Sequence, residues 1–364
     1  MRRRGFLAGA GAAAAGASAA ALAAPAIAQG RTEWRMVTPW PRNTPGVGVN
    51  AQRFADRVTA MTDGRLTIKL FAAGELVPPF ELLDAVMSDT ADIAHGTPYY
   101  WVGKSKALNY FTTIPFGLTA TELAAWLYFG RGMELWQEVY DGFGIRPFYA
   151  GNSGVQAGGW FRNEINTLDN LNGLKFRIAG LGGEVMRRLG ATVVLTPPGE
   201  IGPSLMSGAV DGAEWIGPWN DLAFGLHRVA RFYYTPAFHE PGPGLEIIVE
   251  RGKFEALPSD LQQIIEVAAS ATANETLADF HYHNIETLPT LVEEHGVELR
   301  TFSDDIVRAL GRTTKEVLDE LAASDPLTGR VHDSFMAFLT KADRYAERFD
   351  RRLLEMRALA LGEA

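Results

Sequence analysis

The strongest constraint on the fold is an alternation of strand and helix patterns that starts twice along the chain. The first series begins at residues 34–37 and continues to about residue 150. The second begins at residues 173–178 and reaches the strand around residues 213–215. Alternation of this kind predicts α/β units built on parallel sheets. Two such units in 364 residues predict a two-lobed protein with a cleft between the lobes.

Composition excludes several classes of protein. The chain is 47% hydrophobic, 21% charged and free of cysteine. It is therefore too apolar to be disordered and has no thiolates for disulfides, zinc fingers or iron–sulfur clusters. Its net charge of −9 argues against nucleic acid as a partner, because a phosphate-binding surface needs clustered Lys and Arg.

Residues 1–28 have the pattern of an export signal. Arg2, Arg3 and Arg4 precede a run rich in Ala and Gly, and an A-x-A-like cleavage site ends at Ala28. The start of this segment resembles a twin-arginine (Tat-type) signal peptide. An uncleaved helical anchor is the alternative. No other stretch approaches about 20 uninterrupted apolar residues, so we expect a soluble, periplasmic product.

The end of the chain, residues 331–357, is expected to be almost continuously helical. Its apolar residues recur at steps of three and four, namely Phe335, Phe338, Leu339, Ala342, Tyr345, Phe349 and Leu353. This apolar stripe must be buried, either against the protein's own lobes or against a second subunit.

The chain carries no motif of a known catalytic site. It lacks a G-x-S-x-G elbow, an H-E-x-x-H helix and a phosphate-binding loop. His281 and His283 are two positions apart on a predicted helix and cannot chelate one ion together. His95 and His239 follow predicted strands and are interpreted as hydrogen-bonded structural residues. The sequence therefore does not predict an enzyme.

Binding is better supported. Arg177 lies in an otherwise apolar strand, and a buried guanidinium is costly unless a planar anion pairs with it. The anion could be a ligand carboxylate, or an internal Asp or Glu. Gln156 lies in a Gly-rich segment, and Glu214 lies among Trp and Gly residues at the end of a strand. Glu214 could be a cleft residue or simply a solvated loop carboxylate.

Several segments resemble the extracytoplasmic solute receptors of tripartite ATP-independent periplasmic (TRAP) transporters over essentially the whole mature chain. They are AGEL at 73–76, GVQAGGWF at 154–161, LNGLKFRI at 171–178, SGAVDGAEW at 207–215, EWIGP at 214–218 and FHEPG at 238–242. The segments at 154–161, 214–218 and 238–242 are similar to the branch that binds 2-oxo or 2-hydroxy acids such as pyruvate and lactate.

The resemblance implies a two-lobed α/β periplasmic binding protein fold, with two α/β domains, hinge strands and a long C-terminal helix. Lobe I would comprise residues 29–155 with a returning segment at about 241–290. Lobe II would comprise residues 156–240 with part of 291–330. Residues 331–364 would form a helix that joins two protomers into a homodimer.

The resemblance also implies the binding site. Arg177 would form a salt bridge with the ligand carboxylate. A cation beside the ligand would be held by Gln156, the Glu214 and Glu240 carboxylates and the Trp215 backbone carbonyl. Gln156, Glu214 and Trp215 would also line the ligand site, together with Tyr99, Tyr100 and Asn220.

Electrostatics gives a reason for the cation. Two like charges about 4 Å apart at an effective dielectric constant near 20 repel by about 4 kcal/mol. One arginine cannot offset Glu214, Glu240 and a ligand carboxylate together, so a proton or a metal ion must intervene. An all-oxygen set of ligands suits Na⁺ or Ca²⁺ rather than Zn²⁺. The resemblance favours Na⁺, and the presence of two carboxylates favours Ca²⁺.

The predicted function is therefore a receptor that closes over a small monocarboxylate and delivers it to the membrane subunits of a TRAP permease. Three alternatives remain. The same fold could serve another organic acid or a sensor kinase, it could serve an ABC importer, or the chain could be a secreted hydrolase or lyase with Glu214 as its base.

Overall fold

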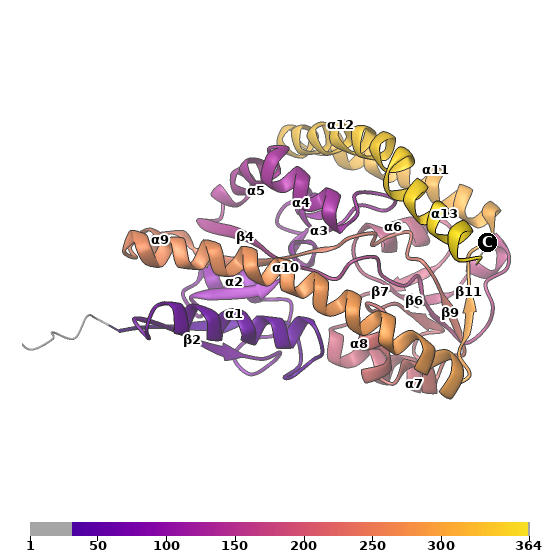
Figure 1. The fold of residues 1–364 in the computed structure, drawn as a ribbon, viewed down its shortest axis with the longest axis horizontal. Coiled ribbons are helices and arrows are strands. Elements are labelled where there is room, and N and C mark those ends of the chain that lie inside the picture. Colours follow the sequence, from indigo (N-terminus) through magenta and orange to yellow (C-terminus); the bar gives the residue numbers. More distant parts are fainter. Residues whose placement is uncertain (1–30, 363–364) are drawn as a thin grey trace, which may run out of the picture.

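The structure of the protein is a computed structural model that describes residues 31–362. It contains two sheets surrounded by helices (Figure 1). The signal peptide predicted over residues 1–28 lies outside the described residues. Within the described range, no helix combines the length and apolarity needed to cross a membrane.

The first sheet has five strands in the order β2-β1-β3-β10-β4. Their bounds are Leu66–Phe71, Thr32–Val37, Ile93–Gly96, Gly244–Glu250 and Ile145–Asn152, respectively. β1 is parallel to β2 and β3, whereas β10 is antiparallel to both β3 and β4. The sheet is therefore mixed, not parallel as the alternation predicted. β10 enters from the second sheet, so no β-helix-β crossover determines its direction.

The second sheet has six short strands in the order β11-β9-β5-β8-β6-β7. Their bounds are Glu298–Arg300, Phe232–Tyr234, Gly159–Phe161, Gly212–Ala213, Lys175–Arg177 and Thr192–Val194, respectively. β6 is parallel to its neighbours β7 and β8, and β5 is antiparallel to β8 and β9. The carboxyl ends of β6 and β8 therefore lie side by side, which brings together the residues that follow them.

Helices cover both sheets (Figure 1). The α-helices are α1 (Val47–Met61), α2 (Leu82–Met87), α3 (Asn109–Thr112), α4 (Ala120–Phe129), α5 (Gly132–Asp141), α6 (Gly180–Arg188), α7 (Ile201–Ser207), α8 (Pro218–Ala223), α9 (Arg251–Glu255), α10 (Ser259–Pro289), α11 (Asp304–Ala322), α12 (Pro326–Arg348) and α13 (Asp350–Leu361). The shorter turns are η1 (Pro98–Trp101), η2 (Lys106–Leu108), η3 (Leu168–Leu171), η4 (Pro198–Glu200), η5 (Leu226–Arg228) and the π-helical η6 (Thr290–Glu294). α10 spans both halves of the molecule, since it packs on α1 and β4 at one end and on α8 at the other.

Two segments connect the sheets through the middle of the molecule. Residues 153–158 lead from β4 to β5, and residues 235–243 lead from β9 to β10. They are hydrogen-bonded to each other: the Gln156 amide donates to the Glu240 carbonyl at 3.1 Å, and the Ala237 amide donates to the Gln156 carbonyl at 2.9 Å. These contacts fix Gln156 and Glu240 beside one another between the sheets.

The largest hydrophobic cluster draws side chains from both sheets. Trp40, in the loop after β1, lies beside Trp215, which follows β8, with ring centroids 6.1 Å apart. Pro41 also faces the second half of the molecule, at Gly199. The two halves are therefore in contact across the region that holds the connecting segments.

The C-terminal region is two helices instead of the single one expected over residues 331–364. α12 begins earlier than predicted, at Pro326, and the chain breaks at Phe349 before α13. The apolar stripe changes from buried to exposed shortly before this break, between Ala342 and Tyr345. Phe335 and Ala342 are buried against the protein's own core, whereas Phe349 and Leu353 are more than half exposed.

Candidate functional site

A buried ion pair occupies the joint carboxyl edge of β6 and β8. Arg177 is the last residue of β6, and Glu214 immediately follows β8. Arg177 Nη1 donates to the Glu214 carboxylate at 2.6 Å and to the Glu214 carbonyl at 2.8 Å, and both side chains are 1% exposed. The Ala179 amide donates to the same carboxylate oxygen at 2.9 Å. The internal Arg–Glu pair weighed in the sequence is thus present, and it ties together residues 37 positions apart.

The surroundings of Glu214 and Glu240 shift the pKa values of the two carboxyl groups in opposite directions. Burial opposes ionisation of Glu214, but the Arg177 guanidinium and His239 outweigh it and lower the pKa of the Glu214 carboxyl. Burial and the nearby Glu214 carboxylate raise the pKa of Glu240 well above its usual value, although the Tyr99 hydroxyl acts in the opposite direction. Two adjacent carboxyl groups therefore favour opposite protonation states, and an added positive charge would let both ionise.

His239 completes the cluster, and the sequence interpretation missed its place. Glu214, His239 and Glu240 each offer one ligand atom, and these atoms lie within 4.8 Å of one another. His239 Nε2 is 3.6 Å from the Glu214 carboxylate. Neither ring nitrogen has a hydrogen-bond partner among the described residues. The signal available in the sequence was the adjacency of His239 and Glu240 in a segment rich in Pro and Gly.

Several buried polar atoms at the site have no partner within the described part of the chain. They include the Gln156 side-chain carbonyl, one Glu240 carboxylate oxygen and Arg177 Nε. The side-chain Nε2 of Gln156 donates to the Ser153 hydroxyl at 2.9 Å, whereas the side-chain oxygen of Gln156 has no partner among the described residues. Buried polar atoms are rarely left unpaired without a reason. Unpaired oxygens beside two carboxylates form a set that fits a hard cation such as Na⁺ or Ca²⁺.

The remaining predicted site residues lie around this cluster at different distances. Trp215 lies next to Arg177, whose guanidinium carbon is 5.7 Å from the indole centroid. Tyr99 and Tyr100 are adjacent rings 5.0 Å apart, and the charges of Arg177, Glu214 and Glu240 act on both hydroxyls. Asn220 is fully buried in α8, and its side-chain amide makes no hydrogen bond within the described part of the chain, to the carboxylates or to any other group.

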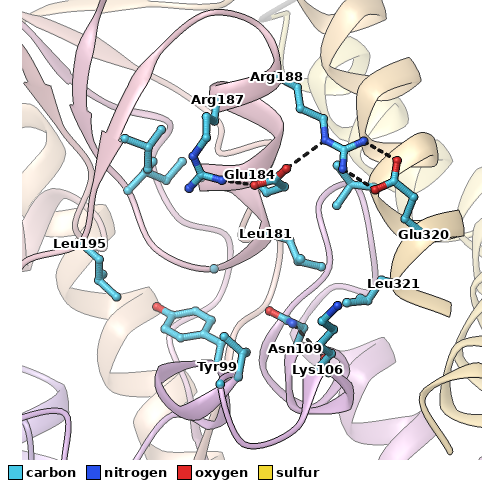
Figure 2. Close-up of a pocket in the computed structure, with 17 residues that line it drawn as sticks. Tyr99, Lys106, Asn109, Leu181, Glu184, Arg187, Arg188, Leu195, Glu320 and Leu321 are labelled. Carbon is cyan, nitrogen blue, oxygen red and sulfur yellow. Dashed lines mark hydrogen bonds and ion pairs between the residues drawn. The ribbon is translucent and has the colours of Figure 1, made fainter. Parts of the chain in front are cut away.

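A cavity of about 530 Å³ is lined by residues of η1, α6 and α11 (Figure 2). Tyr99 forms one wall, and Ile178 and Gly180, which flank the Ala179 amide, form another. At its rim Arg188 bridges Glu184 of α6 and Glu320 of α11, at 3.0 and 2.6 Å. The cavity thus borders Tyr99 and the segment after β6, and neither Arg177 nor Glu214 is among its lining residues.

Comparisons with known proteins agree on one family. The model of the DctP family, described as bacterial extracellular solute-binding protein family 7, matches residues 36–325. The chain is also 42% identical over 305 residues to a monocarboxylate 2-oxoacid-binding periplasmic protein of Nostoc sp.. That alignment covers 84% of this chain and 83% of the relative.

Two solved structures are similar to this fold over nearly their whole length. A TRAP transporter solute-binding protein of Bordetella bronchiseptica, a dimer with calcium and picolinate in one active site, has a TM-score of 0.89 and 32% identity, covering 91% of this chain and 98% of that one. A TRAP periplasmic solute-binding protein of Pseudoalteromonas atlantica with bound sodium and pyruvate has a TM-score of 0.87 and 37% identity, covering 89% and 99%.

Proposed function

The chain belongs to the bacterial extracellular solute-binding proteins of family 7, the solute receptors of TRAP transporters, and from this premise we propose that its ligand is a small 2-oxo or 2-hydroxy monocarboxylate bound together with a cation. As a member of this family it is an extracytoplasmic receptor of a transporter and not an enzyme. Pyruvate is the representative ligand, because a relative of the same fold was crystallised with it.

The observation that carries this proposal is that the Nε–H group of the Arg177 guanidinium has no hydrogen-bond partner among the described residues. Its Nη1 atom is occupied by Glu214 and one Nη2 hydrogen by the Thr196 carbonyl at 3.2 Å, but Nε has no partner among the described residues. A guanidinium presents Nε and Nη2 side by side, which matches the two oxygens of a carboxylate. Glu214 thus fixes the guanidinium from one side, and the ligand carboxylate would bind on the other.

The cation would be held by Gln156, Glu214, the Trp215 carbonyl and Glu240. The unpaired oxygens of Gln156 and Glu240 support this assignment, as does the opposite shift of the two glutamate pKa values. When bound, the ion supplies positive charge that lets both carboxylates and the ligand coexist in a dry site. We propose Na⁺, with Ca²⁺ as the alternative. One relative was crystallised with sodium and another with calcium.

Binding would close two lobes around the ligand. We propose that lobe I comprises residues 29–155 with 241–290, and lobe II residues 156–240 with part of 291–330. Each lobe then contains one sheet, and the connecting segments 153–158 and 235–243 serve as the hinge. The closed form would dock on the TRAP membrane subunits. Export through a Tat-type signal at residues 1–28 and a homodimer through the C-terminal helices complete the proposal.

Calorimetric titration of the purified mature protein tests the ligand assignment. Pyruvate, lactate and a dicarboxylate such as succinate are titrated in Na⁺ buffer, in Ca²⁺ buffer and in choline buffer with a chelator. We expect binding of pyruvate or lactate that requires Na⁺ or Ca²⁺. Arg177→Ala is expected to abolish it, and the matched exposed change Arg131→Ala is expected to leave it unchanged. The proposal would be wrong if Arg177→Ala bound pyruvate with wild-type affinity, or if the wild-type protein bound succinate but neither pyruvate nor lactate.

A further inference from the structure

We infer that Asp221 is a positioning residue that aims the Trp215 carbonyl at the proposed cation, an inference that depends on the cation site proposed above. Asp221 lies in α8 and is fully buried. Its Oδ1 accepts from the Ile216 amide at 3.2 Å, and its Oδ2 accepts from Trp160 Nε1 at 2.9 Å and from the Tyr233 hydroxyl at 2.8 Å. Three donors thus bind the two oxygens of this carboxylate and fix its orientation.

The bond to Ile216 determines the direction of the preceding carbonyl. The Trp215 C=O and the Ile216 N–H belong to the same planar peptide group, and in a trans peptide they point in opposite directions. By holding the N–H, Asp221 turns the Trp215 oxygen away from itself. The side chain therefore acts on a proposed cation ligand through a single rigid unit, without touching the ion.

The Trp215 carbonyl is also the one left unbound. The next carbonyl, that of Ile216, accepts from the Ala157 amide at 3.0 Å. No hydrogen bond to the Trp215 carbonyl occurs among the described residues, although Trp215 is only 5% exposed. A buried carbonyl without a donor is costly. A cation beside the Glu214 and Glu240 carboxylates would satisfy it.

The anchors of Asp221 belong to the rigid core of the second sheet. Trp160 of β5 and Tyr233 of β9 are direct neighbours in the antiparallel register. Their rings are stacked with centroids 4.0 Å apart, and both side chains are fully buried. This platform places Oδ2 and leaves Oδ1 for the Ile216 amide. Residues that orient metal ligands in this way typically change metal affinity by about 10- to 100-fold when they are mutated.

Two substitutions separate this role from a merely structural one. In Asp221→Asn one of the two acceptor oxygens becomes an NH2 donor, which must face either the Ile216 amide or Trp160 Nε1, so the group can no longer hold the peptide and its anchors together as the carboxylate does. Tyr233→Phe removes only one anchor and keeps the carboxylate. Tyr234→Phe is the matched control, because Tyr234 is the next residue of β9 and its buried hydroxyl binds the Ile165 amide, away from Asp221.

The test is calorimetric titration of Ca²⁺ and of Na⁺ into the full mature protein, with circular dichroism and melting temperature as checks on folding. We expect Asp221→Asn to weaken cation binding by about 10- to 100-fold and Tyr233→Phe to weaken it severalfold. Tyr234→Phe should lower only the melting temperature. Lower cation affinity in Tyr233→Phe than in Tyr234→Phe supports the inference even where Asp221→Asn does not fold.

Wild-type cation affinity in folded Asp221→Asn, or equal affinities in Tyr233→Phe and Tyr234→Phe, overturns the inference while leaving the cation site intact. Absence of cation binding in the wild-type protein overturns the cation site itself, and the positioning role falls with it. Pyruvate binding in the same preparation separates these cases, since its loss in the wild type would reject the proposed function as a whole.

Discussion

Single buried acids in this protein carry different charges because their neighbours differ. Glu214 is held ionised by Arg177 at 2.6 Å. Glu246 of β10 is equally buried, but its neighbours are neutral: the Tyr140 hydroxyl at 2.8 Å and Trp101 Nε1 at 3.1 Å. Burial therefore raises the pKa of Glu246 to about 8. The Glu246 carboxyl group therefore keeps its proton at neutral pH.

Glu246 predicts a pH dependence of stability with a definite sign. Its pKa is about 8 in the folded protein, against the ordinary value of 4.5, so the folded state binds the extra proton between these values. The stabilisation is complete below pH 4.5 and is lost as the pH rises towards 8, with a slope of at most about 1.4 kcal/mol per pH unit.

Glu246→Gln mimics the protonated form and tests this expectation. Urea unfolding between pH 5 and pH 9 should give a flatter dependence for Glu246→Gln than for the wild type, with the variant the more stable of the two at high pH. The exposed substitution Glu316→Gln is the control and should follow the wild-type curve. Parallel curves for Glu246→Gln and the wild type would show that Glu246 is ionised in the folded protein.

At the scale of elements, the site depends on connections and not on regular structure. Gln156, His239 and Glu240 lie in the two segments that join the sheets, and the segment 235–243 fits closely against the start of α4. A Cβ atom on Gly242 would overlap the backbone nitrogen of Ala120. By contrast, a Cβ atom on Gly311, inside α11, would meet no atom within 4 Å. The atoms that the Gly242 Cβ would meet belong to the backbone of α4 and of the residue before it, and backbone cannot move aside as a flexible side chain can.

Alanine at these two glycines should therefore have opposite effects. Gly242→Ala must displace backbone and is expected to destabilise the protein by about 1–3 kcal/mol, with loss of ligand binding because Glu240 moves with it. Gly311→Ala restricts the unfolded chain without a clash and is expected to stabilise by about 0.4–1 kcal/mol. Urea unfolding with calorimetric titration measures both. A Gly242→Ala protein as stable as the wild type would contradict the tight fit.

Sequence patterns predicted which segments form helices and strands better than they predicted which strands pair and in which direction. The alternation indicated two α/β units, and Arg177 in an apolar strand and Glu214 at the end of a later strand were identifiable as candidates. The pairing of Arg177 with Glu214 depends on β6 and β8 being neighbours, and strand order is not encoded locally. The direction of β10, the place of His239 and the bond between Asp221 and Trp160 likewise arise from contacts between segments distant in sequence.

At the scale of the whole molecule, the two halves meet at the candidate site, while the C-terminal end extends beyond the core. The connecting segments, Trp40 and Trp215 all lie between the sheets, so ligand and cation would bind where the halves touch. α13 contributes nothing to either core, because none of its residues is buried. A helix whose apolar side chains stay exposed on its own chain indicates a surface that something else covers.

A second copy of this chain is the occupant we expect on α13. Five of its apolar side chains are more than half exposed, namely Leu353, Leu354, Met356, Leu359 and Leu361. A cavity of about 520 Å³ is lined by the start of α4, by Phe338, Ala342 and Tyr345 of α12, and by Asp350, the first residue of α13. A stable interface buries about 1,200–2,000 Å², more than one short helix provides, so α12 must contribute as well.

Deleting residues 350–364 should therefore convert a dimer into a monomer without harming the lobes. The molar mass from light scattering is expected to halve, while the melting temperature at low protein concentration and the affinity for pyruvate stay close to wild type, because α13 packs on neither core. Leu359→Glu should act in the same direction as the deletion, since it places a charge in the apolar contact, whereas the nearby polar change Glu355→Gln should not. A wild-type protein that is already monomeric at micromolar concentration would reject the homodimer, and a truncated protein that no longer binds pyruvate would mean that α13 supports the lobes after all.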